Sequence, residues 1–502
     1  MSKAESAQGD MNEILGLESR APRGKAETNR KPLSRQAHLG QFMTPPGVAR
    51  FMCELFASPM PTKVRLIEAG AGHAALTAAF VKHRSSQITE RLEAHAYECD
   101  ESVTEDLRRT LSECEKVGGV STRTFGGDFI EAAATMIRLR RGPRYSHAIL
   151  NPPYKKITSD SKHRQWLRAI GLETVNLYTG FLGLVIELLE PGGQAVAIIP
   201  RSFCNGPYYK PFRAFMAARC AIRHIHLFES RSQAFRADDV LQENVIILLE
   251  RGAPQGDVTV STSMDDRFSD YSAKSYPFSQ IVFADDPEGF IHIPTASSGE
   301  GAAVPGAFQA RLSDLGIEVS TGPVVDFRLR EWLRHMPESG TVPLLYSGHF
   351  GGAGVHWPIP ALKKPNAIKR NSETEKWLYP NGFYAVVRRF SSKEEKRRIV
   401  ASVVDPRALP GEVLGFENHL NVFHQGRKPL PELLARGLSL FLNGTGADQS
   451  FRRFNGHTQV NATDLRQLKY PTRDTLIKLG RWAKENPAVT QEMIDQSIVS
   501  HA

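Results

Sequence analysis

Seven short apolar runs alternate with stretches of helical periodicity from about residue 37 to residue 252, and this alternation limits the fold more than any other feature of the chain. The stretches between them, such as ESVTEDLRRTLSECEKV and NLYTGFLGLVIELLE, carry apolar residues at helical spacing. Strands that alternate with helices form parallel sheets with crossover helices, so an α/β domain is predicted over residues 37–252. The runs are VRLIEAG, AHAYECD, TRTFGGD, HAILNPP, AVAIIP, IRHIHLF and NVIILLE.

The rest of the chain divides into three further segments. Residues 1–36 are polar and basic with little apolar periodicity, which predicts disorder. Residues 253–310 are rich in Ser, Asp, Gly and Pro and predict a connecting segment. Residues 311–490 have an irregular pattern, richer in aromatic and basic residues, which predicts a separate α+β domain. A chain of 502 residues is long enough for two or three domains of this size.

Charge and cysteine usage narrow the class of protein. The chain has 63 Lys and Arg against 54 Asp and Glu, a formal charge of +9, and this mild excess suits a polyanionic partner, although many proteins without one show the same balance. No apolar run approaches the roughly 20 residues of a membrane span, and the N-terminus does not resemble a signal peptide. Five cysteines without paired spacing indicate a reducing cytoplasm and no zinc site: Cys53, Cys99, Cys114, Cys204 and Cys220.

The sequence HAILNPPYKK, residues 147–156, places polar residues directly after a buried strand. Pro152 and Pro153 exclude both helix and central strand, so Asn151 and Tyr154 are predicted to lie on a stiff loop. This loop follows the carboxyl end of its strand, which is where open α/β sheets bind their ligands.

A glycine-containing turn follows the first predicted strand. In LIEAGAGHAALT the strand ends at Glu68, and Gly70 and Gly72 precede a helix. Glycines at this position allow a ligand to approach the backbone, although a tight turn without a ligand is an equally common reason for them.

Two further strand ends carry acidic residues. Glu98, about 26 residues after Gly72, has the place of a carboxylate that accepts hydrogen bonds from both hydroxyls of a ribose. Asp128 and Phe129 follow the third strand and offer an acceptor for an exocyclic amine and a ring for stacking. Each carboxylate alone is more often a solvated strand end, but three in succession indicate an adenosine-containing cofactor.

With these motifs in order, the sequence resembles the N6-adenine DNA methyltransferases that have an N-terminal cofactor motif, an NPPY motif and a C-terminal target-recognition domain, as in type II restriction–modification methylases. The resemblance covers residues 37–252 firmly and the remainder loosely. It departs from the family where Ala69-Gly70-Ala71-Gly72 replaces the common Pro-Ala-Cys-Gly. The matching segments are GQFMTPPGVARFM, EAGAGHAAL, YECD, GDFI, NPPY, NLYTGFLGLVIELLEPGGQAVAIIPRSF and FRRFNGHTQVNATDLRQLKYP.

This resemblance implies a doubly wound, Rossmann-like domain that binds S-adenosylmethionine. Thr44 and Pro45 would border the cofactor, together with the backbone at Gly70 and Gly72. Glu68 would lie near the methionine amino group and Glu98 at the ribose. Asp128 and Phe129 would take the adenine ring.

The resemblance also assigns the NPPY loop to catalysis. The Asn151 side chain and the Pro152 carbonyl would accept hydrogen bonds from the two N6 hydrogens of adenine, and so localise the nitrogen lone pair for attack on the methyl sulfonium. Pro152 and Pro153 would keep this geometry preorganised. Tyr154 would stack on the target base, which must leave the duplex to be reached.

Further residues are assigned to the nucleic acid. Phe235 is a candidate for the opposite face of the base, with packing in the core as an equal alternative. Lys155 and Lys156 are candidates for a phosphate contact, against a solvated lysine pair. Arg452 and Arg453 are candidates for DNA contacts, against pairing with nearby carboxylates.

No metal cluster or nuclease-like arrangement of carboxylates and lysine is evident. His224 and His226 lie in one apolar strand and are predicted on opposite faces, which argues against a shared metal ion.

Three functional hypotheses follow. The leading one is a monomeric, cytoplasmic DNA adenine-N6 methyltransferase of a bacterial restriction–modification system, associated with the nucleoid through double-stranded DNA and paired with an endonuclease for the same site. The second keeps the chemistry but acts on RNA or a protein glutamine. The third is a DNA-binding specificity protein with an inactive methyltransferase fold, which the intact Asn151 to Tyr154 loop disfavours.

Overall fold

The computed structural model describes residues 44–228, 243–284, 286–294, 308–351, 354–391, 395–455 and 459–501. Its contacts divide the chain into two compact units, Met1–Thr295 and Ala296–Ala502, each with its own hydrophobic core. The segment 1–36, for which we predicted disorder, lies outside the described residues.

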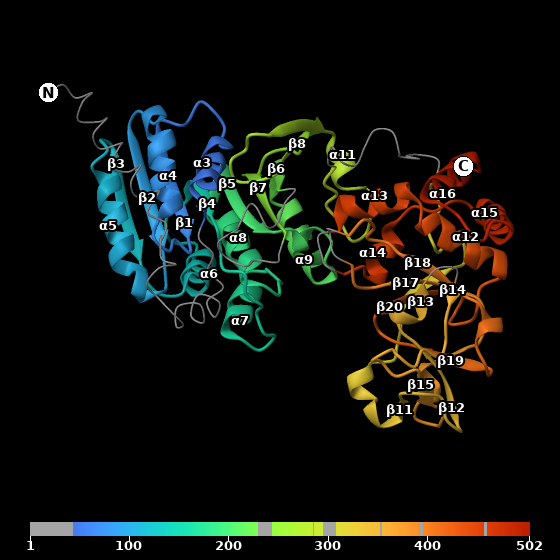
Figure 1. Ribbon diagram of the computed structural model, residues 1–502. Helices are drawn as coiled ribbons and strands as arrows, with labels where there is room; N and C mark the ends of the chain where they lie inside the picture. Colours follow the sequence, from blue (N-terminus) through green and yellow to red (C-terminus); the bar gives the residue numbers. More distant parts are fainter. Residues whose placement is uncertain are drawn as a thin grey trace. The chain divides into compact units, whose positions relative to one another are not determined.

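The first unit is built on a nine-stranded sheet in the order β3-β2-β1-β4-β5-β7-β6-β8-β9 (Figure 1). All seven apolar runs form strands, as the sequence predicted. The strands are β1 (Lys63–Ala69), β2 (Arg91–Tyr97), β3 (Val120–Phe125), β4 (Tyr145–Leu150), β5 (Leu189–Pro200), β6 (Cys220–Phe228), β7 (Asn244–Arg251), β8 (Val258–Ser263) and β9 (Ser272–Tyr276).

The parallel arrangement holds from β1 to β5 and fails at β7. Strands β3, β2, β1, β4 and β5 pair in parallel, as predicted. Strand β7 instead inserts between β5 and β6 and pairs antiparallel with both. A strand buried on both faces is apolar whatever its direction, so the pattern NVIILLE could not reveal this reversal.

The prediction of a connecting segment over 253–310 is wrong for its first part. Strand β8 pairs in parallel with β6, and β9 pairs antiparallel with β8, so the sheet continues past residue 252. Val258 and Val260 are buried in the same core as the preceding strands. The alternation of Val with Thr and Ser in β8 is typical of a strand, but the polar residues around it concealed this signal.

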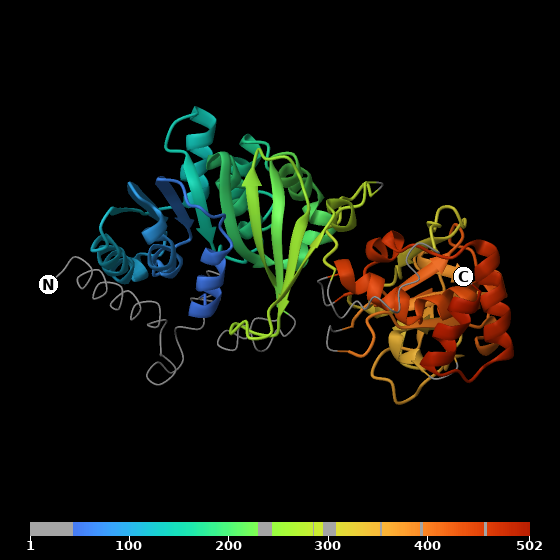
Figure 2. The ribbon, with the colours of Figure 1, turned by 90° about the horizontal axis from the view of Figure 1, so that it is seen from above.

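Helices cover both faces of the sheet (Figure 2). Successive residues in β1 point to opposite faces: Leu66 packs into the core beneath α3 and α4, and Ile67 into the core beneath α6 and α8. The fold is therefore a doubly wound, Rossmann-like α/β domain. The helices are α3 (Pro46–Glu54), α4 (Ala75–Arg84), α5 (Thr104–Glu115), α6 (Phe129–Leu139), α7 (Lys162–Ala169), α8 (Leu177–Leu188), α9 (Lys210–Ala217) and α11 (Phe278–Ile281).

The histidine pair in β6 was placed incorrectly by the sequence analysis. Ser261 Oγ lies 2.7 Å from His224 Nε2 and 2.8 Å from His226 Nδ1, so the two rings share a face. Residues two apart in a strand point the same way, which is the physical reason for the correction. Among the described residues, no group of three or more His, Cys, Asp and Glu side chains is arranged to hold a metal ion.

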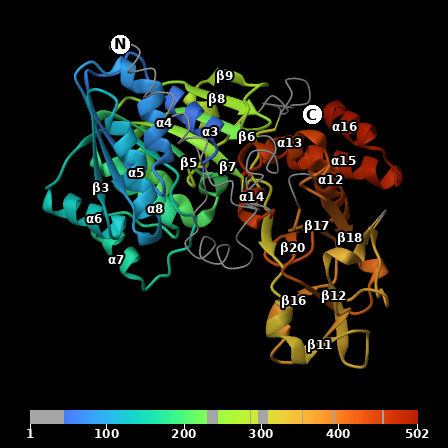
Figure 3. The ribbon, with the colours of Figure 1, turned by 60° about the vertical axis from the view of Figure 1, so that its left-hand side comes forward.

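The second unit combines small sheets with a group of helices (Figure 3), an α+β arrangement as predicted. One four-stranded antiparallel sheet contains β10 (Glu318–Thr321), β20 (Leu420–His424), β17 (Tyr384–Arg388) and β18 (Ala401–Val404). A five-stranded sheet contains β11 (Leu333–Arg334), β15 (Ala367–Lys369), β12 (Thr341–Leu345), β19 (Val413–Phe416) and β16 (Leu378–Pro380), and a two-stranded one contains β13 (Phe350–Gly351) and β14 (Gly354–Val355). The helices are α12 (Glu432–Leu442), α13 (Thr445–Phe454), α14 (Ala462–Gln467), α15 (Arg473–Glu485) and α16 (Gln491–Ser500).

Helices α12 and α15 touch through a pair of glycines. A Cβ atom at Gly437 would lie 1.8 Å from the Leu476 carbonyl oxygen, and one at Gly480 would lie 1.8 Å from the Leu433 carbonyl oxygen. Any side chain at either position would push the two backbones apart, so the glycines set the distance between these helices.

Candidate active site

The order of the sheet places a ligand site between β1 and β4. The chain proceeds from β1 outward to β2 and β3 and then returns to the other side of β1 with β4 and β5, which makes this position a topological switch point. Ligands of open α/β sheets bind at the carboxyl ends of the strands at such a point.

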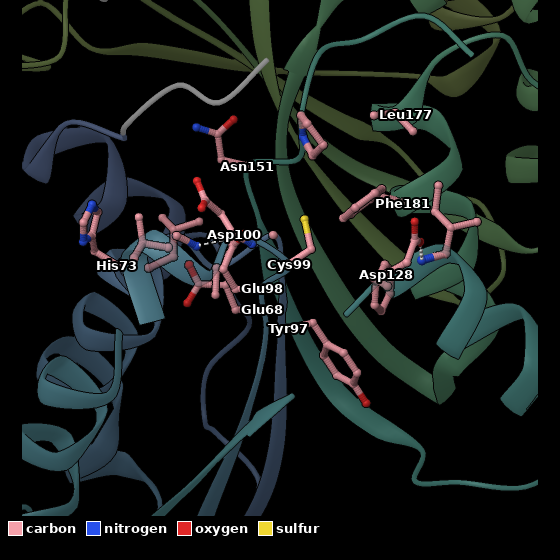
Figure 4. A pocket seen from close by; sticks show the side chains of 18 of the residues that line it. Glu68, His73, Tyr97, Glu98, Cys99, Asp100, Asp128, Asn151, Leu177 and Phe181 are labelled. Carbon is pink, nitrogen blue, oxygen red and sulfur yellow. Dashed lines mark hydrogen bonds between the residues drawn. The ribbon is translucent and has the colours of Figure 1, made fainter. Parts of the chain in front are cut away.

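A cavity of about 400 Å³ lies there (Figure 4), a size that suits a small-molecule ligand. It brings together most of the residues predicted to form the site, from segments more than 100 residues apart in the chain. The predicted residues that line it are Thr44, Glu68, Gly70, Gly72, Glu98, Asp128, Phe129, Asn151, Pro153 and Lys155.

The glycine turn leaves backbone exposed to the cavity. Gly70 and Gly72 have φ angles of 75° and 54°, in the left-handed region that glycine adopts without strain. A Cβ atom at Gly72 would meet no protein atom within 4 Å, so the space beside its backbone is open to a ligand.

Glu68 is buried and caps the helix that follows the turn. Its Oε2 accepts hydrogen bonds from the Thr77 amide at 2.9 Å and the Thr77 hydroxyl at 2.5 Å. Thr77 is the third residue of α4, whose N-cap residue Ala74 has no side chain that can accept. Burial raises the pKa of Glu68 to about 8, against the lowering effect of the Thr77 hydrogen bonds. A cation in the cavity would favour the ionised carboxylate.

Glu98 links two loops through its carboxylate. Its Oε2 accepts from the Gly72 amide at 2.8 Å and its Oε1 from the Asp100 amide at 2.7 Å. Glu98 therefore fixes the glycine turn against the loop that follows β2.

Asp128 and Phe129 form the opposite end of the cavity. Asp128 is the N-cap of α6, and its Oδ1 accepts from the amides of Ile130 at 2.8 Å and Glu131 at 3.2 Å. Phe129 is 4% exposed, and its ring centroid lies 5.0 Å from that of Phe181, also in the cavity wall. The ring available for stacking is thus supported from behind by the core.

The NPPY loop holds its asparagine by hydrogen bonds on both sides. Asn151 Nδ2 donates to Thr44 Oγ1 at 3.0 Å, and Tyr154 Oη donates to Asn151 Oδ1 at 3.0 Å. The same hydroxyl lies 3.2 Å from the Ile198 carbonyl oxygen of β5. Burial raises the pKa of Tyr154 far above its usual value, so the phenol stays protonated as a donor. A hydroxyl group therefore contacts each end of the Asn151 amide and holds the side chain in place.

Some predicted residues do not line the cavity. Pro45, Pro152 and Tyr154 neighbour residues that do, but are not part of its wall. Lys155 is exposed at its edge. Phe235 lies outside the described residues.

Arg452 has partners within its own unit. Its Nε lies 2.7 Å from Asp448 Oδ2, and its guanidinium donates to the Glu395 carbonyl at 2.9 Å. Asp448 is buried and also accepts from the amides of Arg398 and Ile399. The structure therefore shows the carboxylate pairing that was the alternative for Arg452, and a DNA contact of this residue stays a prediction.

The sequence analysis missed several cavity residues, of which His163 is the most important. It lies in α7, twelve residues after Asn151, and its Nε2 is 2.5 Å from Asp128 Oδ2. No sequence signal marks this histidine, because the contact depends on how α7 packs on α6. Tyr97, Cys99 and Asp100 also line the cavity, and they belong to the motif YECD in which only Glu98 was singled out.

Comparison with known proteins finds relatives of one kind, the methyltransferases of restriction–modification systems. The Eco57I restriction-modification methylase family model matches residues 93–235. The type II methyltransferase M.BsuBI of Bacillus subtilis is 49% identical over 460 residues, which cover 90% of this chain and 92% of that protein. The type II methyltransferase M.PstI of Providencia stuartii is 42% identical over 475 residues, covering 92% and 93%.

A solved structure extends the likeness in fold across both units. The type IIL restriction-modification enzyme MmeI, in complex with DNA, has a TM-score of 0.51 and 9% sequence identity. The match covers 100% of this chain and 75% of that one.

Proposed function

This chain belongs to the type II methyltransferases of restriction–modification systems, and from that premise we propose that it transfers a methyl group to the N6 amine of adenine in duplex DNA. It is a DNA methyltransferase whose methyl donor is S-adenosylmethionine. One observation carries the choice of an amine as the group that receives the methyl. The Asn151 side-chain amide is held in the wall of the cavity that also contains Glu68, Glu98 and Asp128.

The residues of the cavity fit S-adenosylmethionine in chemical type. Glu68 suits the positively charged amino group, since a neighbouring cation would stabilise its ionised form. Glu98 places a carboxylate in the cavity wall, which suits the two ribose hydroxyls as an acceptor. Asp128 and Phe129 supply an acceptor and a ring for adenine. When bound, the cofactor supplies an electrophilic methyl group on a sulfonium.

Asn151 would act on the target amine. The lone pair of an adenine amine is delocalised into its ring, and hydrogen bonds from its N–H groups to fixed acceptors favour a tetrahedral, nucleophilic nitrogen. The Asn151 side-chain oxygen would accept one N6 hydrogen, and the Pro152 carbonyl oxygen the second.

Thr44 and Tyr154 would keep that acceptor in place. Thr44 Oγ1 accepts from the amide nitrogen and Tyr154 Oη donates to the amide oxygen, so both ends of the Asn151 amide are held. Such preorganisation avoids reorientation during the reaction. The Tyr154 ring would also stack on the target base, which we propose is turned out of the duplex, with Phe235 as a candidate for its second face.

We propose that residues 311–490, which belong to the second unit, read the DNA sequence. The basic residues Lys155 and Arg453 are candidates for phosphate contacts, because phosphate contacts fix the register of a protein on DNA. We further propose a partner endonuclease for the same site, a cytoplasmic location and action as a monomer. No helix in the described part of the chain is long and apolar enough to cross a membrane.

Identification of the methylated base tests this function. The full-length protein is incubated with labelled S-adenosylmethionine and unmethylated genomic DNA, and the DNA is digested to nucleosides. We expect label in N6-methyl-2′-deoxyadenosine; label in a methylated deoxycytidine would refute adenine specificity. Parallel reactions with RNA and with total protein separate the alternative substrates.

The variant Asn151→Ala tests the mechanism in the same assay. Loss of one preorganised hydrogen bond costs about 2.7 to 4 kcal/mol, so turnover should fall roughly 100- to 1000-fold while cofactor affinity is retained. Asn486→Ala is a matched control, because the Asn486 side chain donates to the Trp482 carbonyl within the second unit and does not line the cavity. Turnover near the wild-type rate in Asn151→Ala would exclude Asn151 as the acceptor.

A further inference from the structure

Asp128 is held by two elements at once. Its Oδ1 accepts from the Ile130 and Glu131 amides at the start of α6, and its Oδ2 lies 2.5 Å from His163 Nε2. A carboxylate oxygen only accepts hydrogen bonds, and an imidazole has an N–H whether it is charged or neutral, so His163 is the donor in this contact. Burial alone would raise the pKa of Asp128, but the hydrogen bond and charge of His163 outweigh it, and the net shift is downward.

The imidazole is itself fixed by its helix. His163 is in the first turn of α7, where Ser161 caps the helix by accepting from the Arg164 amide. Arg164 and Arg168 both pair with Glu173, which ties α7 to the segment that leads into α8. Trp166, one turn along, has its ring centroid 5.9 Å from that of His163. His163 thus reaches the cavity from a helix anchored on two sides.

The acceptor positions of Asp128 can be counted. An ionised carboxylate offers about four, and the two amides and His163 occupy three. One position remains, on Oδ2, the oxygen that His163 contacts. Both Asp128 and His163 line the cavity, so the remaining position is available to a ligand there.

We propose that His163 is a positioning residue that fixes the last acceptor of Asp128 for a single N–H donor, and so makes the site select a cofactor base with an exocyclic amine over one with a carbonyl. This inference rests on the placement of the cofactor adenine at Asp128 proposed above. A carbonyl at the same place would set two acceptors against each other, and the carboxylate would lose its partner. Without His163 the carboxylate could turn about its side-chain bond and accept from other groups.

Binding of two product analogues tests the proposal without turnover. S-adenosylhomocysteine carries the amine, and S-inosylhomocysteine carries a carbonyl in its place. Calorimetry on the full-length wild type should give roughly 10- to 100-fold weaker binding of the inosyl compound, the range for a hydrogen bond to a charged group. His163→Ala should bind the adenosyl compound more weakly and reduce this ratio towards one.

Two variants separate positioning from a structural effect. His163→Gln retains an N–H donor and should restore the ratio. Gln165→Ala, at an exposed position of the same helix, should leave affinities and ratio unchanged. If His163→Ala weakens both ligands equally and lowers the melting temperature, His163 only supports α7 and the proposal is overturned.

Asp128→Ala distinguishes failure of this inference from failure of the cofactor placement. If that variant loses the discrimination but His163→Ala keeps it, the inference about His163 is wrong while adenine remains at Asp128. If the wild type binds both compounds equally and Asp128→Ala changes neither affinity, the cofactor placement itself is wrong.

Discussion

Substitution of Glu68 by glutamine tests whether this carboxylate faces a cation. Burial raises its pKa to about 8 from an ordinary value of 4.5, so between these pH values the folded chain holds a proton that the unfolded chain has lost. A group with a raised pKa contributes stability that is complete below the unfolded pKa and is lost as pH rises through the folded one. The free energy of unfolding without cofactor should therefore fall from about pH 4.5 to about pH 8.

The size of this effect follows from the width of the window. One pKa unit corresponds to about 1.4 kcal/mol and the window spans about 3.5 units, so the loss reaches up to about 5 kcal/mol. Glu68→Gln keeps the shape and an acceptor for Thr77 but never ionises. Calorimetric melting of both proteins from pH 5 to pH 8 gives the difference, taken from the transition that S-adenosylmethionine shifts. Parallel curves for the two proteins would refute the raised pKa.

Cofactor binding should cause the Glu68 carboxyl group to lose its proton. A positively charged amino group beside the carboxylate lowers its pKa, so at pH 6.5 S-adenosylmethionine should displace about one more proton from the wild type than from Glu68→Gln. Titrations in buffers with different ionisation enthalpies measure this number. Adenosine has no such amino group and should show no difference between the two proteins. Equal proton release with S-adenosylmethionine would place the amino group away from Glu68.

Three further predictions concern other parts of the molecule. Asp128→Ala should weaken S-adenosylmethionine binding roughly tenfold or more, while Tyr154→Ala should spare it and lower turnover; equal affinity losses in calorimetry would contradict this division of the site. Arg452→Ala should lower the melting temperature of the second unit and leave the salt dependence of DNA binding unchanged, whereas a flatter salt dependence would restore its role at a phosphate. Gly437→Ala should destabilise the second unit by at least about 1 to 3 kcal/mol and leave cofactor affinity intact, because its Cβ would meet the Leu476 carbonyl; an unchanged melting temperature would disprove the close helix contact.

The sequence predicted the first seven strands because strands buried in a sheet are continuous apolar runs between turn residues. It could not predict the direction of β7, since an apolar run is the same in both directions. It also missed β8, where Thr and Ser alternate with Val, and β9, a polar strand that forms the edge of the sheet. An edge strand needs little apolar sequence, so the polar residues after residue 252 led us to end the predicted α/β domain too early.

The candidate site was predicted where it depends on topology alone. Glu68, Glu98 and Asn151 follow the ends of neighbouring parallel strands, and such ends meet at one edge of the sheet whatever the details of packing. The contact of His163 with Asp128 depends on the angle between α6 and α7, which no local pattern encodes. The pairing of Arg452 with Asp448 has the i,i+4 spacing of a helical ion pair, which is visible in the sequence. The sequence analysis nevertheless took Arg452 as a candidate for a DNA contact, because it stands beside a second arginine, Arg453.

Glu68, Glu98 and Asp128 all lie at strand ends in the sequence, but the hydrogen-bond donors around them in the cavity differ. Glu68 is buried with Thr77 as partner and has a raised pKa, so it suits a ligand that brings a positive charge. Glu98 accepts one backbone amide on each oxygen, and a carboxylate whose two oxygens lie side by side suits a pair of hydroxyls. Asp128 keeps a single position, which suits one N–H group. An amino group, a ribose and an adenine amine occur together, in that order along one molecule, in S-adenosylmethionine, so the distribution of protein donors around the carboxylates is itself an argument for how the cofactor is oriented.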